Sequence, residues 1–267
     1  MKLEIFDVAH GACALLSCDD GSLLMIDCAG NPDTGWQPAD CLRRRGHPHL
    51  KALVITNYDE DHVRGLPQLR RTVQIEWLFR NATVSPDTIR QLKTEDGMGP
   101  GIEELCRMAD IYRPSNGLPP QFPGVQVRTF RNVYGEFDDE NNLSLVFILD
   151  IQGVRFVFPG DLETAGWQKL LEDPAFREVM ANVNVLVASH HGRESGICDE
   201  LFTLHQCSPH YVVISDKGYM FDTQETVAYY GSKTRGGPFR GETRKVLTTR
   251  NDGMITFHFT GTEWFPA

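Results

Sequence analysis

The sequence contains the stretch Thr56-Asn57-Tyr58-Asp59-Glu60-Asp61-His62-Val63-Arg64-Gly65-Leu66, and the apolar run of residues 52–55 leads directly into it. The apolar run predicts a buried strand. Ligands of open α/β sheets gather at such strand ends. A polar turn that caps the next helix is an equally simple interpretation of this stretch when it is taken alone. Four side chains that can bind a metal ion follow the end of the strand: Asn57, Asp59, Asp61 and His62.

Two later apolar runs end in a similar way. Residues 154–158 precede Pro159-Gly160-Asp161, and residues 183–188 precede Ser189-His190-His191-Gly192. Each motif on its own is common in turns. Together with the first stretch they favour a metal site, because manganese, zinc and iron bind mixed sets of imidazole and carboxylate groups.

Length and composition limit the classes of protein to consider. The chain has 267 residues, of which 41% are hydrophobic and 23% charged, as in globular proteins. Its net charge of −10 argues against a protein that coats nucleic acid through bulk electrostatics. The 7 cysteines contain no Cys-x-x-Cys pair, so neither a disulfide framework nor a cysteine zinc site is indicated. With no apolar run of about 20 residues and no signal-peptide core, we expect a cytoplasmic protein that has no membrane partner.

Groups of strands alternate with groups of helices along the chain. Strand patterns open it at residues 3–8, 12–17 and 23–28, with a hairpin turn at residues 19–22. The later patterns predict helices at 38–45, 66–71, 85–112 (broken at 97–101) and 167–180, strands at 52–55, 73–79, 125–130, 143–150, 154–158, 183–188 and 211–215, and a closing hairpin of residues 246–250 and 254–259. This order predicts an α+β fold, a single domain over residues 1–267, with two antiparallel-rich sheets packed face to face and helices outside.

Several stretches together resemble the metallo-β-lactamase superfamily, and within it the hydrolase domain of the DNA-uptake competence protein ComEC and its stand-alone relatives. The likeness runs from residue 3 to about residue 259, and the ordered combination is more specific than any single piece. The stretches are Phe6 to Gly11, Met25 to Gly30, Thr56 to Gly65, Asn141 to Val146, Pro159 to Asp161, His190 to Gly192 and Thr249 to Gly253.

This resemblance implies an αββα sandwich of two mixed, largely antiparallel sheets with a site for one or two divalent metal ions, manganese or zinc, between them. One metal ion would be held by Asp61, His62, Asp161 and His190. The other would be held by Asn57, Asp59 and the shared Asp161. The resemblance also implies catalytic roles for Asp61 and for His191, the latter either as a general acid or as a hydrogen-bonded support of a ligand.

The sequence departs from the family pattern at three places. Asn57 stands where the first motif histidine is usual, and an amide oxygen is a weaker ligand than imidazole for zinc. Residues 9–12, which include His10, replace the usual Gly-Gln-Gly-Asp turn, and the later Asn-x-x-x-His-Pro segment is absent after Ser215. These departures leave the occupancy of the second metal site open.

Residues outside the ligand motifs are candidates for substrate binding: His10, Asn142, Ser144, Lys217 and Arg235. The last two belong to a late basic group near the Gly-rich residues 231–241 and the aromatic Tyr229 and Tyr230. Such a loop suits a phosphate backbone. An ordinary solvated surface loop explains the same composition.

Three functions remain as hypotheses. The first is a metal-dependent phosphodiesterase, most simply a nuclease that acts on DNA or RNA. The second is a hydrolase of a small ester, such as a phosphorylcholine ester, on the same site. The third is a partner-binding protein with a weakened site, in which Asn57 marks the loss of metal binding; the sequence does not identify that partner protein.

Overall fold

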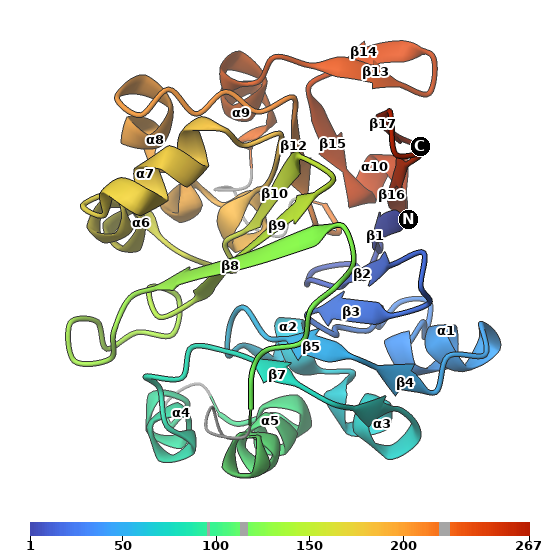
Figure 1. The fold of residues 1–267 in the computed structure, drawn as a ribbon. Coiled ribbons are helices and arrows are strands. Elements are labelled where there is room, and N and C mark those ends of the chain that lie inside the picture. Colours follow the sequence, from blue (N-terminus) through green and yellow to red (C-terminus); the bar gives the residue numbers. More distant parts are fainter. Residues whose placement is uncertain (95–96, 113–116, 219–224) are drawn as a thin grey trace.

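Two large sheets lie face to face, and helices cover their outer sides (Figure 1). This computed structural model describes residues 1–94, 97–112, 117–218 and 225–267. The arrangement confirms the αββα sandwich that the strand and helix patterns predict. Within the described residues, none of the helices combines the length and the apolar character that a membrane crossing needs.

The first sheet contains both ends of the described chain. It is antiparallel from β17 to β3 and parallel from β3 through β5 to β7. The hairpin predicted at residues 19–22 joins its strands β2 and β3. In spatial order the strands are β17 (Trp264–Pro266), β16 (Ile255–Phe259), β1 (Lys2–Ile5), β2 (Ala14–Ser17), β3 (Leu23–Ile26), β5 (Ala52–Val54) and β7 (Leu78–Phe79).

The second sheet is antiparallel from β8 to β10 and parallel from β10 to β15. Both sheets are therefore mixed, as predicted, although the parallel share of the second sheet is larger than the pattern suggested. In spatial order its strands are β15 (Val246–Thr248), β12 (Tyr211–Ile214), β11 (Val185–Val187), β10 (Val154–Phe158), β9 (Leu145–Ile151) and β8 (Val125–Arg131).

Strand β9 shows why the sequences of the central strands are continuously apolar. Leu145, Phe147 and Leu149 pack in the core between the sheets, whereas Val146 and Ile148 pack in the core beneath the helices. Successive side chains of a strand point to opposite faces, so a strand that is covered on both sides needs apolar residues throughout.

The helices divide between the two outer faces. The first sheet is covered by α1 (Pro38–Arg44), α3 (Leu66–Thr72), α4 (Pro86–Leu92) and α5 (Pro100–Ile111). The second is covered by α6 (Thr164–Leu170), α7 (Pro174–Ala181), α8 (Asp199–Thr203) and α9 (Val227–Lys233). The break predicted at residues 97–101 begins between α4 and α5, although Pro100 and Gly101 already belong to α5. The helix predicted at 167–180 is two helices, because Asp173 caps a new one whose first residue is Pro174.

Short elements complete the chain. They are α2 (Glu60–Val63), α10 (Thr249–Asp252), the 3₁₀ turns η1 (Ser189–Gly192) and η2 (Glu194–Gly196), and the small sheets β4 (His49–Leu50) with β6 (Gln74–Ile75) and β13 (Gly237–Phe239) with β14 (Glu242–Arg244). The strand predicted at 73–79 is thus two strands in different sheets.

The predicted closing hairpin is wrong. β15 pairs with β12 in the second sheet and β16 pairs with β1 in the first, so the chain crosses between sheets where the hairpin turn was expected. The Asp252 side chain accepts a hydrogen bond from the backbone N–H of Thr248 at 2.8 Å and closes the helical turn α10. Gly253, at φ 67°, then redirects the chain. An Asp-Gly pair is therefore as compatible with the end of this helical turn as with a hairpin turn.

Candidate metal centre

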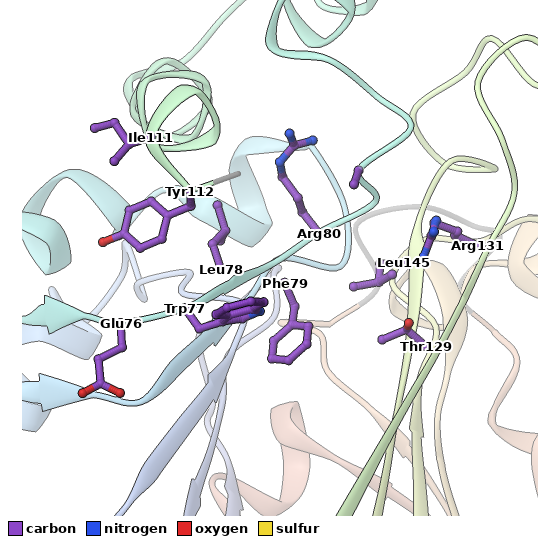
Figure 2. A pocket seen from close by; sticks show the side chains of 11 residues that line it. Glu76, Trp77, Leu78, Phe79, Arg80, Ile111, Tyr112, Thr129, Arg131 and Leu145 are labelled. Atoms are coloured by element: carbon purple, nitrogen blue, oxygen red, sulfur yellow. The ribbon is translucent and has the colours of Figure 1, made fainter. Parts of the chain in front are cut away.

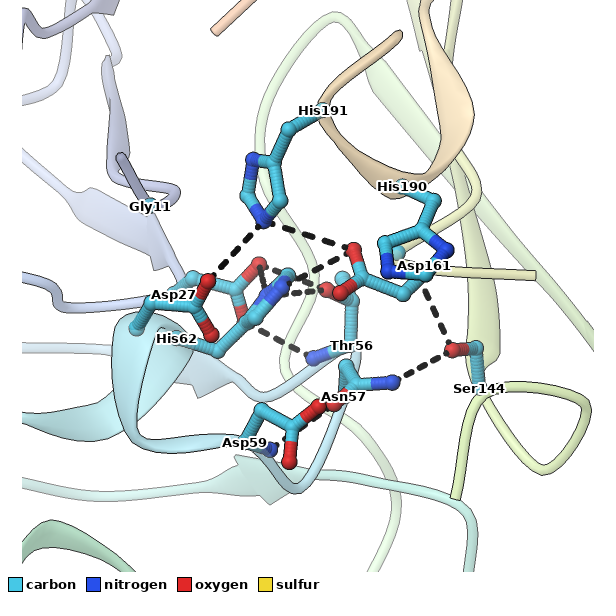
Figure 3. Close-up of polar contacts among 12 residues, drawn as sticks. Gly11, Asp27, Thr56, Asn57, Asp59, His62, Ser144, Asp161, His190 and His191 are labelled. Carbon is cyan, nitrogen blue, oxygen red and sulfur yellow. Dashed lines mark hydrogen bonds and ion pairs between the residues drawn. The ribbon is translucent and has the colours of Figure 1, made fainter. Parts of the chain in front are cut away.

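The three polar strand ends meet between the sheets (Figure 3). Asp61 and His62 follow β5 of the first sheet, Asp161 follows β10 of the second, and His191 follows β11. The backbone N–H of Leu145 donates to the carbonyl of Thr56 at 2.7 Å and ties the two sheet edges together. Strand ends from both sheets therefore deliver these side chains to one place.

Four potential ligand atoms lie within 4.8 Å of one another, one each from Asp61, His62, Asp161 and His191. His62 Nε2 is 3.0 Å from Asp161 Oδ1. His191 Nε2 is 3.3 Å from Asp61 Oδ2 and 3.6 Å from Asp161 Oδ1. Tetrahedral zinc with bonds of about 2.0–2.2 Å spaces its ligand atoms about 3.3–3.6 Å apart. The group therefore has the spacing of a metal site.

The chemistry of the group also fits a cation. Within the described residues the buried Nε2 of His191 makes no hydrogen bond, although it faces two carboxylates. Burial opposes the charge of Asp61 and of Asp161. The neighbouring His191 and His62 outweigh that effect for both groups and hold each pKa well below its usual range. Two ionised carboxylates and two imidazoles suit zinc, manganese or iron.

Two further groups orient the histidines. His62 Nδ1 donates to Asp27 Oδ2 at 3.0 Å, and Asp27 in turn accepts from the backbone N–H of Thr56 at 2.8 Å. His191 Nδ1 donates to the carbonyl of Ser215 at 3.0 Å. Each contact occupies Nδ1 and leaves Nε2 pointing into the group, as is usual for histidines that bind metals.

Asp27 was not among the predicted site residues. It follows the apolar strand β3 and is buried, so the same strand-end signal could have identified it. Its contact with His62 joins residues 35 positions apart. That contact depends on β3 and β5 being neighbours in the sheet.

We expect Asp27→Asn to weaken metal binding by about 10–100-fold while preserving the fold, because an amide of the same shape supports the His62 imidazole less well. Calorimetric titration with Zn²⁺ measures the affinity. Asp150→Asn is the matched control, since Asp150 pairs with Arg155 near the opposite end of β9 from the site. Equal affinities of the two variants would contradict the supporting role of Asp27.

His190, rather than His191, was the implied ligand, and the structure places it differently. His190 Nδ1 lies 3.0 Å from Ser195 Oγ and 3.2 Å from Glu163 Oε1, and His190 is not part of the group of four. His190 and His191 both have left-handed backbones, with φ of 51° and 53°. Such residues cost about 1–3 kcal/mol each and cluster at functional sites. This strained turn directs the two adjacent rings to different neighbours.

Asn57 and Asp59, the implied second ligand set, lie beside the group on the loop after β5 (Figure 3). Asn57 Oδ1 accepts from the backbone N–H of Asp59 at 2.8 Å. Asp59 forms an ion pair with the buried Lys93, which also contacts Glu140 at 2.6 Å. Asp59 occupies the N-cap position of α2, as the capping interpretation of this stretch expects, but its side chain accepts no hydrogen bond from that helix. Lys93 ends α4, where a lysine normally indicates a solvated helix terminus, so no sequence signal pointed to it.

The comparison with known families agrees with this geometry. The sequence model described as "Metallo-beta-lactamase superfamily" matches residues 7–195. The chain belongs to the metallo-β-lactamase superfamily. This membership confirms the resemblance that the strand-end motifs carry.

One curated relative and three solved structures extend the comparison. ComE operon protein 3 of Bacillus subtilis (strain 168) is 26% identical over 176 residues, which are 65% of this chain and 21% of that protein. This chain thus spans about a fifth of that relative's length.

All three structures are less than 15% identical to this chain, so they show the fold alone. The metallo-β-lactamase fold protein YhfI from Bacillus subtilis has a TM-score of 0.51 at 10% identity and covers 95% of this chain and 99% of its own. Zn²⁺-bound PqqB from Methylobacterium extorquens has a TM-score of 0.50 at 14% identity and covers 97% and 100%. The E377D mutant of the CmlA β-hydroxylase has a TM-score of 0.54 at 11% identity and covers 96% and 54%.

The predicted substrate-binding residues of this superfamily member separate into three groups. His10 lies at the site, with Nε2 3.4 Å from Asp61 Oδ2 and its ring 4.5 Å from that of His191. Burial, helped by the nearby His191, lowers the pKa of His10 to about 4. A neutral imidazole therefore stands beside the ligand group at neutral pH.

Ser144 and Asn142 are buried structural supports. Ser144 Oγ accepts hydrogen bonds from the backbone N–H of Asp161 and from the Asn57 amide, each at 3.1 Å. Asn142 Oδ1 accepts from the backbone N–H of Gly166 at 2.8 Å, and its Nδ2 donates to Asp139. Through these contacts the two side chains stabilise the loops around the site, and Ser144 fixes the backbone of Asp161.

Lys217 and Arg235 lie away from the ligand group. Lys217 is exposed and pairs with Asp33 at 2.7 Å. The Arg235 guanidinium contacts His210, the residue before β12, whereas the ligands follow the opposite, carboxyl ends of β10 and β11. Parallel strands keep their starts at one edge of the sheet, so Arg235 is separated from the ligand group by the length of the strand.

A cavity of about 510 Å³ opens beside the ligand group. Its lining includes His10, Asp59, Asp61 and three cationic side chains, Arg64, Lys93 and Arg193. A separate pocket of about 350 Å³ lies between β7 and β8 (Figure 2). Its lining is largely apolar and includes Trp77 and Phe79. Within the described part of the chain, the lining of that second pocket contains none of the four ligand residues, whereas Asp61 lines the first cavity.

Proposed function

We propose that this protein is a metal-dependent hydrolase of phosphodiesters, with Asp61, His62, Asp161 and His191 as the ligands of a zinc or manganese ion. The observation that carries the proposal is the juxtaposition of this anionic ligand group with a cavity that also presents Arg64, Lys93 and Arg193. A metal centre beside cationic side chains suits a substrate that bears negative charge next to the bond to be cleaved.

A bound divalent cation supplies a water nucleophile at neutral pH and stabilises charge on the phosphoryl oxygens. The residues of this chain position that chemistry. Asp27 and the Ser215 carbonyl hold the two imidazoles through Nδ1. Ser144 holds the backbone of Asp161. In this arrangement His191 would serve as a ligand, which does not leave its Nε2 free to act as a general acid.

The basic side chains of the cavity would bind the substrate. Arg64 donates to the carbonyl of His10 at 2.6 Å, which holds its guanidinium at the cavity wall. Arginine binds phosphate oxygens through paired N–H groups. The net charge of −10 is compatible with such a local basic rim, because bulk attraction to nucleic acid is not required.

DNA or RNA is the substrate class that we propose first. Its support is the resemblance to the hydrolase domain of the DNA-uptake competence protein ComEC, and the likeness to ComE operon protein 3 points to the same group of proteins. A small phosphate ester, such as a phosphorylcholine ester, is the second candidate. The cavity volume of about 510 Å³ favours this alternative, since it falls in the range of small-molecule sites.

The test is hydrolysis of bis-p-nitrophenyl phosphate by purified protein loaded with Mn²⁺ or Zn²⁺. We expect turnover that chelation abolishes and that added metal restores. Cleavage of single- and double-stranded DNA and RNA, compared with cleavage of p-nitrophenyl phosphorylcholine, then separates the two substrate classes. Protein that binds no metal ion and cleaves none of these substrates would instead support the partner-binding hypothesis.

A further inference from the structure

Lys93 places a positive charge where the family resemblance implies a second metal ion. Its side chain is only 3% exposed and contacts two carboxylates, Asp59 and Glu140. A buried ammonium is stable only with such partners, so this contact is a built feature of the loop.

Asn57 is also committed to other contacts. Its Oδ1 accepts from the Asp59 N–H at 2.8 Å. Its Nδ2 donates to Ser144 Oγ at 3.1 Å and to the carbonyl of Glu140 at 3.3 Å. The carbonyl acceptor on one side and the N–H donor on the other define the orientation of the amide. Its only metal-binding atom therefore faces the backbone of its own loop.

We propose that the ε-ammonium group of Lys93 takes the place of a second metal cation, so that the centre holds one divalent metal ion beside a buried lysine. The inference rests on the metal site of the proposed function. Asp59 pairs with Lys93 and so is not available to a second metal ion. Asp161 then belongs to one metal ion only, rather than bridging two.

The position of Lys93 explains how a single metal ion could suffice. Lys93 lines the same cavity as Asp61, Arg64 and Arg193. An ammonium has three N–H donors, and the contacts with Asp59 and Glu140 use two of them within the described part of the chain. Two-metal centres neutralise phosphoryl oxygens from two sides. Here the lysine would occupy the place of the second cation and offer its remaining N–H to a phosphoryl oxygen, without any change in metal content.

The metal stoichiometry of the wild-type protein tests the proposal directly. Protein saturated with Mn²⁺ should bind one ion per chain by calorimetry and elemental analysis, and its electron paramagnetic resonance spectrum should show the six lines of an isolated Mn²⁺. Two ions per chain with an exchange-coupled spectrum would overturn the inference and leave the proposed hydrolase intact. Absence of any bound metal would overturn the metal site itself, so the two failures are distinguishable.

Variants at position 93 provide the second measurement. Lys93→Ala frees the carboxylates of Asp59 and Glu140, and we expect its stoichiometry to rise from one Mn²⁺ per chain to two. Lys93→Arg retains the cation, so it should still bind one ion and keep more turnover than Lys93→Ala. A stoichiometry of one in Lys93→Ala, measured on folded protein at millimolar Mn²⁺, contradicts the proposal.

Lys169→Ala is the matched control. Lys169 also lies between two carboxylates, Glu136 at 3.8 Å and Glu172 at 3.0 Å, but its side chain is 41% exposed on α6. This variant should bind one Mn²⁺ per chain like the wild type. If Lys93→Ala does not fold, the wild-type stoichiometry and the Lys93→Arg variant still decide the question.

Discussion

Asp161→Ala is expected to abolish metal binding and to reduce hydrolysis of bis-p-nitrophenyl phosphate by at least about 10³-fold. Asp161 Oδ1 lies 3.0 Å from His62 Nε2 and 3.6 Å from His191 Nε2, so it is the carboxylate that contacts both imidazoles. Loss of one hydrogen-bond donor to a transition state costs about 10²–10³-fold. Loss of the whole metal ion should cost more, because the activated water is lost with it.

The control for this prediction separates chemistry from folding. Asp150→Ala removes a carboxylate from an ion pair with Arg155 on the same sheet and should leave turnover unchanged. Circular dichroism and thermal unfolding should show both variants folded, since the methyl group of alanine fits where the carboxylate stood. Wild-type turnover in Asp161→Ala would refute the site.

His191→Ala and His190→Ala are expected to differ strongly, although the residues are adjacent. His191 Nε2 faces Asp61 and Asp161, whereas His190 Nδ1 faces Ser195 and Glu163. Loss of a group that supports a ligand typically weakens metal affinity about 10–100-fold. Loss of His191 as a direct ligand should exceed that range, and loss of His190 should stay within it.

The two histidines form their own matched pair. Both have left-handed backbones with nearly equal φ, so alanine meets the same backbone strain at either position. Titration with Zn²⁺ and Mn²⁺ measures the affinities, and hydrolysis of bis-p-nitrophenyl phosphate measures the consequence for turnover. A larger loss in His190→Ala would restore the ligand set that the family resemblance implies.

Much of the fold was predictable because it depends on local patterns. The apolar run of residues 143–150 is long enough for a strand, and it lacks the polar alternation of a strand with one face in water. It forms β9, which is buried on both faces. Ser85 and Pro86 predicted the start of α4, and Ser85 Oγ accepts from the Thr88 N–H at 3.0 Å. The prediction of a closing hairpin was wrong because an Asp-Gly pair is compatible with two backbone paths. The chain takes the path in which β15 pairs with β12 in one sheet and β16 pairs with β1 in the other.

The candidate site shows the same division. Asp61, His62 and Asp161 could be grouped from the sequence, because each follows an apolar strand and strand ends converge. The metal-binding roles of these residues remain predictions. The roles of Asp27 and Lys93 were not predicted from the sequence, since their partners His62 and Asp59 lie 35 and 34 positions away.

The sequence by itself determined the two-sheet architecture with helices outside and the strand ends that carry the polar groups, because periodicity and turn residues act over a few neighbouring positions. Its ordered motifs also identified the superfamily by resemblance. Only the tertiary structure decided that His191, not His190, joins the group of four, and that a buried lysine accompanies Asp59. The direction of a side chain after a left-handed turn, and the pairing of charges from distant helices, depend on how the two sheets and the helix α4 pack together. No local pattern encodes that packing.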